Sequence, residues 1–339
     1  YQCDWSSDVC SSDLGGWLIA ERWMTAGLFE GVSGDGERAI GYELGQTEAE
    51  RRLKSHRDTF ITEKDFSWLA KQGFDFVRLP VGYWLFEADE GFVPGEQYVR
   101  HAFRWARKHH IGVVLDFHGL QGSQNGQDHS GQTGKMRAMR RQNRKKALRT
   151  LEHLVTTYGK EPSLIGVEVI NEPHARFGFW LWPLLRYYDQ AVTIAKRHLP
   201  SNVKIIISDA FLPKRMARAM VRRQYGKRVV LDIHLYQVFS RAEQRMSLQA
   251  HIDKVQGEWK DLLSELSEST IVLVGEWSAA LPAAAYEYIS GGEHEQVHQY
   301  YAAQETLYEN STWGHCYWSY KAPGCGVWGW SESQIILGK

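Results

Sequence analysis

Short, continuous runs of hydrophobic residues alternate with amphipathic stretches along almost the whole chain. Runs rich in Val, Ile and Leu, without polar alternation, are typical of strands that are covered on both faces. Eight such runs follow residue 14, and they predict strands at 17–20, 74–81, 111–119, 164–173, 203–210, 228–236, 270–278 and 315–321.

Helical periodicity fills most of the intervals between these runs. Thr62 and Asp65 form the pattern of a capping box, Phe66 and Leu69 follow on one face, and Gly73 marks the end of the helix. Apolar residues spaced three and four apart also predict helices around 99–106, 148–158 and 184–198. The predicted elements therefore alternate between strand and helix.

Eight parallel strands with intervening helices close into a (β/α)8 barrel, the TIM-barrel architecture. The main alternative is a doubly wound open sheet, which needs a glycine-rich phosphate turn after its first strand. The sequence GGWLIAE at 15–21 does not provide that turn. Because no internal repeat, low-complexity linker or proline-rich hinge divides the chain, we predict a single α/β domain over residues 15–339.

The first fourteen residues, YQCDWSSDVCSSDL, differ in character from the rest of the chain. They have neither helical nor strand periodicity, and they lack the basic start, apolar centre and cleavage site of a signal peptide. We interpret residues 1–14 as an artefactual leader in place of the native start, and we exclude them from the predicted fold. The missing secretion signal is therefore no evidence for the cytoplasm, and a secreted or periplasmic location stays open.

Charge and composition exclude several classes of protein. The 339 residues include 40 Lys and Arg against 40 Asp and Glu, so no net charge attracts nucleic acid or an anionic membrane. No apolar run reaches the roughly 20 residues of a membrane span. Basic residues cluster between 135 and 149, where a solvated loop and helix start is favoured over a polyanion site. The 14 Trp residues fit either stacking on sugars or a large core.

Ionisable and hydrogen-bonding side chains recur near the carboxyl ends of the predicted strands. In a barrel these ends converge on one mouth, where the catalytic groups lie. A single His at a strand end is more often a hydrogen-bonded core residue. Recurrence on so many strands is hard to explain by packing, because charged groups are rarely buried unless they are paired. The residues are Arg78, His118, Asn171, Glu172, His234, Tyr236, Glu276 and Trp318.

Two glutamates stand at the centre of this set. Glu172 and Glu276 belong to the fourth and seventh predicted strands, which can place their carboxyl groups roughly 5 Å apart across the mouth, the spacing of a retaining glycosidase. One carboxyl must then be protonated and the other ionised. Arg78 and Tyr236 are expected to hold one of them ionised, and its negative charge is expected to raise the pKa of the other.

Other members of the set suit a sugar as the ligand. Asn171 can donate a hydrogen bond to a sugar 2-hydroxyl, and Trp318 offers a flat apolar face under the ring. Metal binding is the competing interpretation for His118 and His234. Because no HExxH or Cys/His spacing supports it, we predict neither a metal nor another cofactor.

The motifs around these residues resemble glycoside hydrolase family 5, and within it the exo-β-1,3-glucanase-like branch. The resemblance extends over residues 15–339, and its most specific signal is INEP at 170–173 followed by GEWS at 275–278. It implies a (β/α)8 barrel and a retaining, metal-free, double-displacement mechanism with Glu172 as acid/base and Glu276 as nucleophile. Further matching stretches are GGWLIAERWMTAGLFEG (15–31), HRDTFITEKDFSWLAKQGFDFVRLPVGYW (56–84), LDFHGLQGSQNGQDHSG (115–131), DIHLYQVF (232–239) and YWSYKAP (317–323).

The same resemblance implies that Glu21 and Asp128 bind the terminal glucose, which favours release of single glucose units from a laminarin-type β-1,3-glucan. A surface ion pair is the alternative for Glu21. Phe239 matches one half of an aromatic clamp around the next sugar, whereas Gln127 stands where the other aromatic is expected. The site for the outgoing sugar is therefore predicted to be looser.

Several alternatives stay open at this point. The same chemistry could act on a β-1,6- or β-1,4-linked glucan or on a glycolipid β-glucoside. A non-catalytic sugar-binding barrel is disfavoured because both glutamates are present, and nucleic acid is disfavoured by the balanced charge. Trp328 and Trp330 are expected either to cover the mouth or to pack against the last helix. The sequence predicts no oligomeric state.

Overall fold

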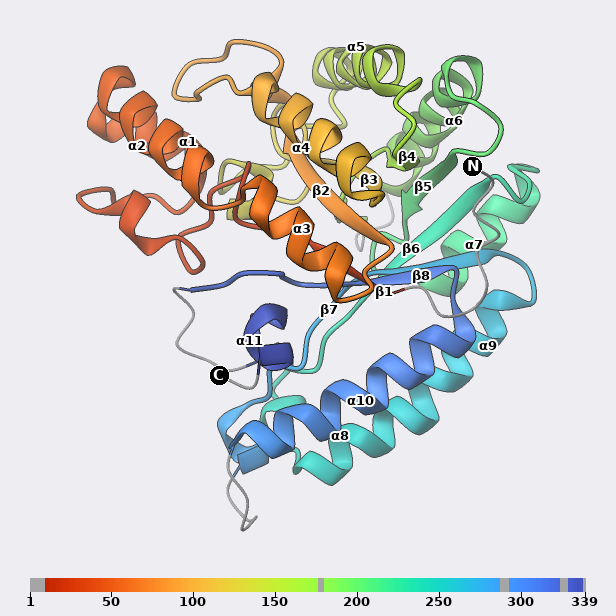
Figure 1. The fold of residues 1–339 in the computed structure, drawn as a ribbon. Helices are drawn as coiled ribbons and strands as arrows, with labels where there is room; N and C mark the ends of the chain where they lie inside the picture. Colours follow the sequence, from red (N-terminus) through yellow and green to blue (C-terminus); the bar gives the residue numbers. More distant parts are fainter. Residues whose placement is uncertain (1–9, 176–179, 287–292, 324–328, 338–339) are drawn as a thin grey trace.

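Eight strands form a closed barrel, and neighbours in the barrel follow one another in chain order until β8 pairs with β1 (Figure 1). The computed structural model describes residues 10–175, 180–286, 293–323 and 329–337. All eight pairings are parallel, so the predicted (β/α)8 barrel is confirmed. The strands are β1 (Cys10–Asp13), β2 (Phe76–Gly82), β3 (Gly112–Gly119), β4 (Leu164–Glu168), β5 (Lys204–Ser208), β6 (Val229–Leu235), β7 (Ile271–Trp277) and β8 (Gly314–Tyr317).

Helices surround this barrel, with α1 to α4 on one side and α8 to α10 on another in Figure 1. The α-helices are α1 (Glu37–Leu44), α2 (Gln46–Thr59), α3 (Glu63–Lys71), α4 (Glu96–His109), α5 (Arg141–Tyr158), α6 (Leu181–His198), α7 (Pro213–Arg222), α8 (Leu248–Lys254), α9 (Lys260–Ser267), α10 (Glu293–Ser311) and α11 (Glu332–Leu337). Short helical turns are η1 (Ala26–Phe29), η2 (Tyr83–Leu85), η3 (Asp128–Ser130), η5 (Glu243–Arg245), η6 (Val255–Trp259) and η7 (Ala283–Tyr286).

The strands are buried on both faces, as their unbroken apolar runs predict. All residues of β2 and β3 are buried. One face of the strands packs against the helices, and the other fills the barrel interior. The interior cluster takes one residue from each of six strands, namely Phe76, Val114, Ile206, Val230, Leu273 and Cys316.

The helix predicted after Thr62 begins as its capping box indicates. The backbone N–H of Thr62 donates to the Asp65 carboxylate over 2.7 Å, and α3 extends from Glu63 to Lys71. Helix α4 buries the predicted stripe of Val99, Ala102, Phe103 and Ala106 against the barrel.

The first strand is not where the hydrophobic pattern places it. Strand β1 is Cys10–Asp13, within the segment that we excluded, and its Ser11 lies opposite Phe76 on one side and Cys316 on the other. The exclusion of residues 1–14 from the fold is therefore wrong for 10–13. Its cause is that β1 has the sequence CSSD, which carries no apolar run. The foreign origin of this segment stays a prediction.

The apolar stretch 17–20 that we predicted as a strand is buried but irregular. A turn at 15–17 precedes it, and Gly16 adopts a φ of 77° that favours glycine. The stretch thus supplies core side chains just after β1 instead of a strand of its own.

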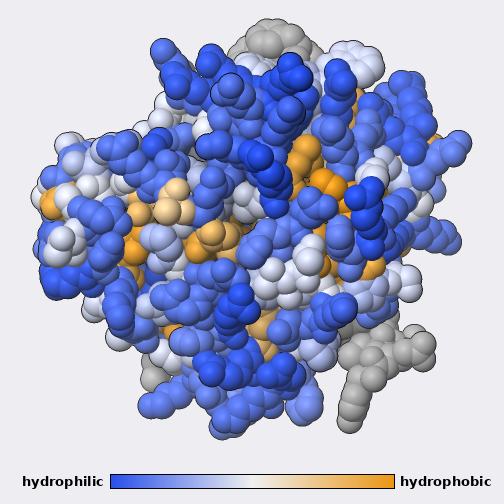
Figure 2. Space-filling view, turned by 90° about the horizontal axis from the view of Figure 1, so that it is seen from above, coloured by the Kyte–Doolittle hydropathy of each residue, from blue (hydrophilic) through white to orange (hydrophobic). Residues whose placement is uncertain are grey.

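The basic segment 135–149 lies at the surface, which agrees with its interpretation as a solvated loop and helix start. Its eight basic residues are exposed, except for the half-buried Arg144, and they lie before and within the start of α5. The face shown in Figure 2 is largely hydrophilic, with hydrophobic side chains visible only in small areas. Among the described helices, none has the length and apolar character that a bilayer crossing requires.

Candidate active site

The eight residues predicted to converge do lie together at the carboxyl-terminal mouth of the barrel. Each comes from a strand or from the residues directly after it, so the parallel topology alone brings them to one place. Strand β4 ends at Glu168, and Asn171 and Glu172 therefore stand on the loop that follows. Those within strands are Arg78, His118, His234 and Glu276, and those beyond strand ends are Asn171, Glu172, Tyr236 and Trp318.

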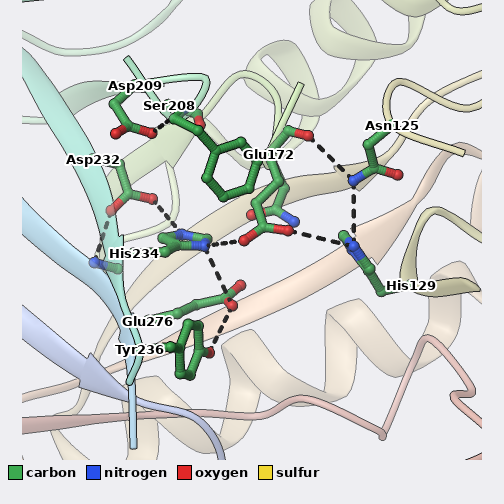
Figure 3. A network of polar contacts seen from close by, with 12 residues as sticks. Asn125, His129, Glu172, Ser208, Asp209, Asp232, His234, Tyr236 and Glu276 are labelled. Atoms are coloured by element: carbon green, nitrogen blue, oxygen red, sulfur yellow. Dashed lines mark hydrogen bonds and ion pairs between the residues drawn. The ribbon is translucent and has the colours of Figure 1, made fainter. Parts of the chain in front are cut away.

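The carboxylates of Glu172 and Glu276 face each other with the ring of His234 beside them (Figure 3). One oxygen of each carboxylate and one nitrogen of His234 all lie within 4.8 Å of one another. Nδ1 of His234 is 2.7 Å from Glu172 Oε1 and 3.3 Å from Glu276 Oε2. The backbone of Glu172 is left-handed, with φ at 41°. Such strained conformations concentrate at functional sites.

Three donors surround the carboxylate of Glu276. Arg78 Nη1 donates to Oε1 over 2.9 Å, and the hydroxyl of Tyr236 donates to Oε2 over 2.9 Å. His234 lies on the same Oε2. Charge-assisted hydrogen bonds of this kind favour the ionised form. Arg78 and Tyr236 thus both donate to one carboxylate, and their predicted role in keeping it ionised stays a prediction.

Glu172 differs from our expectation for the protonated partner. Burial alone would raise its pKa, but the hydrogen bond and charge of His234, followed by the charge of His129, lower the pKa to about 2. His234 in turn has its pKa raised well above 6.5, because the charges of Glu276 and Asp232 outweigh the effect of its burial. The prediction that a neighbouring negative charge raises the pKa of the second glutamate is wrong, because the ring of His234 contacts both carboxylates and its effect on the pKa of Glu172 is the larger one.

Arg78 is completely buried and forms ion pairs with four carboxylates. Besides Glu276 these belong to Asp13 at 2.7 Å, Asp116 at 3.0 Å and Glu168 at 2.8 Å. Burial raises the pKa of both Asp13 and Glu168 well above the usual range despite the charge of Arg78. The mouth therefore rests on a buried layer of acids that the sequence analysis did not identify.

His118, Asn171 and Trp318 form one wall of the site. The ring of Trp318 stacks on His118 with centroids 5.7 Å apart and an interplanar angle of 15°. Asn171 accepts a hydrogen bond from Arg78 Nη2 over 2.8 Å, and its Nδ2 is 3.2 Å from His118 Nε2. Trp318 is 5% exposed.

Glu21 is a buried residue of the mouth and not part of a surface ion pair. It is 3% exposed, its Oε2 accepts a hydrogen bond from Trp23 Nε1 over 2.8 Å, and its Oε1 has no partner among the described atoms. Burial raises its pKa well above 4.5, and the charge of Asp128 adds to this effect. The alternative of a surface ion pair for Glu21 is therefore wrong.

Aromatic side chains line the rim next to Tyr236. Phe239 is 71% exposed and lies edge-on to Tyr236, with ring centroids 5.4 Å apart. Trp330 contacts Trp23, Tyr236 and Phe239, so it belongs to the mouth. Trp328 lies outside the described residues. Gln127 is exposed and adds no ring to this rim.

Two groups of acids with His234 have a spacing that could hold a cation. One is Glu168, Asp232 and His234, and the other is Glu172, His234 and Glu276. In both groups His234 already bonds to the carboxylates, at 2.7 Å to Glu172 and 3.1 Å to Asp232. Since the imidazole nitrogens have these partners, we assign no metal ligands here.

Residues 39–324 match the sequence profile described as Cellulase (glycosyl hydrolase family 5). The chain belongs to glycosyl hydrolase family 5. Among its relatives in the family is "Probable glucan 1,3-beta-glucosidase A" of Emericella nidulans, which is 32% identical over 79% of this chain and 66% of the relative. "Glucan 1,3-beta-glucosidase" of Pichia angusta is 34% identical over 83% of this chain and 67% of the relative. The chain thus spans about two thirds of the length of these relatives.

A solved structure supports the fold of this family 5 member. The crystal structure of a rutinosidase from Aspergillus niger superposes with a TM-score of 0.80 and covers 98% of this chain and 97% of its own. The two sequences are 18% identical, so the likeness concerns the fold.

The sequence analysis missed four acids and one histidine of the site. One of the acids, Asp13, lies in the segment that we excluded from the fold. Asp116 lies two residues before His118 and bonds to its Nδ1 over 2.6 Å, and Asp232 lies two residues before His234 and contacts its Nε2 at 3.1 Å. The shared pattern LD-x-H at 115–118 and 231–234 is a signal that could have found both. Glu168 and His129 carry no comparable signal in the sequence.

Proposed function

We propose that the protein is a retaining β-glucoside hydrolase that releases glucose from the end of a β-1,3-glucan. The observation that carries this proposal is the pair of carboxylates, Glu172 and Glu276, with oxygens within 4.8 Å of each other. A short separation fits a nucleophile and an acid/base, whereas inverting enzymes need a wider gap for a water molecule. The names of the two fungal relatives support a β-1,3-linked glucan as the substrate.

In the first step Glu276 attacks the anomeric carbon, and the bond from that carbon to the glycosidic oxygen breaks. The leaving oxygen takes a proton through Glu172, and a glucosyl ester of Glu276 remains. Arg78 and Tyr236 donate hydrogen bonds to the attacking carboxylate and hold it in place.

In the second step a water molecule attacks the same carbon and gives its proton to Glu172. The ester bond breaks, glucose leaves with its original configuration, and the carboxylate of Glu276 is restored. The proton balance is closed, because Glu172 passes on one proton in the first step and receives one in the second.

The pocket favours removal of a single terminal glucose. Glu21 is buried with one unpartnered oxygen, and Asp128 lies close enough for its charge to affect the pKa of Glu21. Such oxygens can accept hydrogen bonds from the hydroxyls of a terminal sugar and close the site behind it. Polymeric glucan as the substrate also agrees with a secreted or periplasmic location.

A digestion of laminarin tests the proposal. We expect glucose as the only early product, and we expect Glu172→Ala and Glu276→Ala to reduce kcat/KM by about a thousandfold or more. Glu258→Ala is the matched control, because Glu258 is 70% exposed on the outer helical layer. Normal turnover by either active-site variant contradicts the assignment of these residues.

The product pattern and a panel of substrates decide the remaining alternatives. A ladder of oligosaccharides in early digests shows internal cutting and contradicts terminal release. Faster hydrolysis of a β-1,6- or β-1,4-glucan, or of a glucosylated lipid, contradicts the β-1,3 preference but leaves the chemistry of the pair intact.

A further inference from the structure

His129 contacts the carboxylate that the proposed mechanism uses as acid/base, although the sequence gives it no role. It lies on η3 with its side chain 16% exposed, and its Nε2 is 3.3 Å from Glu172 Oε2. The other oxygen, Oε1, faces His234 at 2.7 Å. Glu172 therefore stands between two imidazole rings, one on each oxygen (Figure 3).

The ring of His129 is part of a continuous line of polar contacts that starts at Asp116. Asp116 Oδ2 is 2.6 Å from His118 Nδ1, and His118 Nε2 is 3.2 Å from His129 Nδ1. The line then passes through His129 Nε2 to Glu172. On the far side of Glu172 it continues through His234 to Asp232, whose Oδ2 is 3.1 Å from the ring.

Counting hydrogens along this line locates a proton. The carboxylate of Asp116 accepts the Nδ1–H of His118, so Nε2 of a neutral His118 carries no hydrogen and must accept one. Asn171 Nδ2 and His129 Nδ1 both lie 3.2 Å from this nitrogen. A bare Nδ1 would repel it, so His129 carries its hydrogen on Nδ1. A neutral His129 then has a bare Nε2, which also faces the donor amide Nδ2 of Asn125 at 3.3 Å.

A bare ring nitrogen and an ionised carboxylate oxygen repel each other at 3.3 Å. The contact between His129 Nε2 and Glu172 Oε2 is attractive only when a proton lies between them, on the imidazole or on the carboxyl. The same pair of atoms can hold that proton in either position. The proton is therefore available beside a carboxyl whose pKa is lowered by His234 and by His129 itself.

We propose that His129 is a positioning residue that holds the proton of the acid/base, shared between its Nε2 and Oε2 of Glu172. This inference rests on the proposed glycosidase function. When the glycosidic bond breaks, the shared proton leaves from Glu172 to the departing oxygen. When water attacks, its proton returns to Glu172 and the shared position is refilled, so no other donor is needed.

The charges around His129 and Glu172 act in opposite directions on the affinity of His129 for a proton. Burial lowers the pKa of His129, and the charge of His118 on β3 adds to that effect, while Glu172, Glu276 on β7 and Asp128 on η3 oppose it. Glu172 is faced in addition by His234 on β6. The proton thus belongs to a set of interacting groups, and a pH profile reports the set.

The test compares His129→Asn with the unaltered protein on two glucosides. On laminaritriose, whose leaving oxygen needs a proton, we expect kcat/KM to fall about tenfold to a hundredfold. On 2,4-dinitrophenyl β-glucoside, whose leaving group departs as an anion, we expect a change of less than about threefold. A similar loss on both substrates overturns the proposal, because it indicates a general structural defect.

The pH profile of kcat/KM on laminaritriose gives the second readout. His129→Asn removes one of the two atoms that can carry the shared proton, so the site binds this proton less tightly. The Asn amide can also donate a hydrogen bond, which favours the ionised carboxylate of Glu172. We therefore expect the basic limb of the profile to move to lower pH in His129→Asn, and an unmoved limb or a shift to higher pH overturns the proposal.

Two further variants keep the result interpretable. His129→Gln retains a donor toward Glu172 Oε2 but cannot carry the proton, so the same changes are expected from it if His129→Asn folds poorly. His153→Asn is the matched control on the outer surface of α5, where His153 is 45% exposed. If the unaltered protein hydrolyses neither glucoside, the proposed function fails; if it hydrolyses both and the variants match it, only the role of His129 fails.

Discussion

The guanidinium of Arg78 lies among four carboxylates at the base of the mouth, and none of its surface reaches water. This single planar cation thereby pairs with carboxylates of four strands, β1, β3, β4 and β7, and it reaches the loop after β4 through its bond to Asn171. Arginine suits this place because its donors form a rigid fork that several acceptors can share. The positions of both Glu276 and the buried acids depend on it.

Arg78→Gln should destabilise the protein strongly, because it leaves the carboxylates of Asp13, Asp116 and Glu168 buried without a cation. Removing one partner of a buried ion pair costs about 3–5 kcal/mol. We expect a loss of this size in the free energy of unfolding measured with urea. Arg51→Gln is the control, since Arg51 is 69% exposed and forms an exposed pair. A loss below about 1 kcal/mol for Arg78→Gln contradicts the account.

The eight residues at strand ends could be predicted from the sequence because parallel strands deliver their carboxyl ends to one place. The pKa of Glu172 could not, since it depends on whether His234 or Glu276 lies nearer to each oxygen, and spacing along the chain does not fix that. His129 escaped for a related reason. His129 lies on η3, in the loop after β3, and the sequence position of a loop residue does not show which way its side chain points.

At the start of α3, the capping box joins local sequence to helix stability. Thr62→Ala removes the hydroxyl of the cap, and we expect it to lower the free energy of unfolding by about 1 kcal/mol. The readout is the urea midpoint, with Thr59→Ala near the end of α2 as control. Among the described residues, the hydroxyl of Thr59 donates to carbonyls of its own helix. Equal effects of both substitutions would indicate that the cap contributes nothing specific.

Seven of the predicted strands, and the helices with clear periodicity, agree with the structure. These segments are buried, and burial gives them a recognisable apolar pattern. Strand β1 has no such pattern. It is held by backbone hydrogen bonds to β2 and β8, and those bonds leave no trace in side-chain composition. Conversely, 17–20 is apolar because it is buried, although the turn before it breaks the strand. The sequence therefore predicts which segments are buried, but it does not predict which strand closes the barrel.

Buried carboxyl groups give the whole molecule a dependence on pH. Burial raises the pKa of Glu332 to about 8 and that of Asp209 to about 7. A carboxyl with a raised folded-state pKa contributes stability that is complete below its unfolded pKa and is lost as pH rises through the folded value. His56, His251 and His315 have pKa values lowered to about 4 by burial, so their contribution is lost in acid instead. Stability from Glu332 is therefore lost between about pH 4.5 and pH 8, and stability from the three histidines is lost between about pH 6.5 and pH 4.

Glu332→Gln tests the basic side of this range. Glu332 begins α11 and accepts a hydrogen bond from Tyr301 of α10. We expect the Tm of the unaltered protein to fall by several degrees between about pH 6 and pH 9, and that of Glu332→Gln to fall less. Below about pH 4.5 the two should agree, because the carboxyl is then neutral in both the folded and the unfolded chain. Parallel Tm curves over the whole range contradict the raised pKa.

A ribosome delivers β1 first and β8 last, yet these strands are neighbours in the finished barrel. Ser11 and His315, which meet at this seam, are 304 positions apart. Until β8 has emerged, β1 and β7 each present an open edge that can pair with strands of other chains. The barrel therefore cannot close, and these two edges stay unpaired, until the last strand has been synthesised.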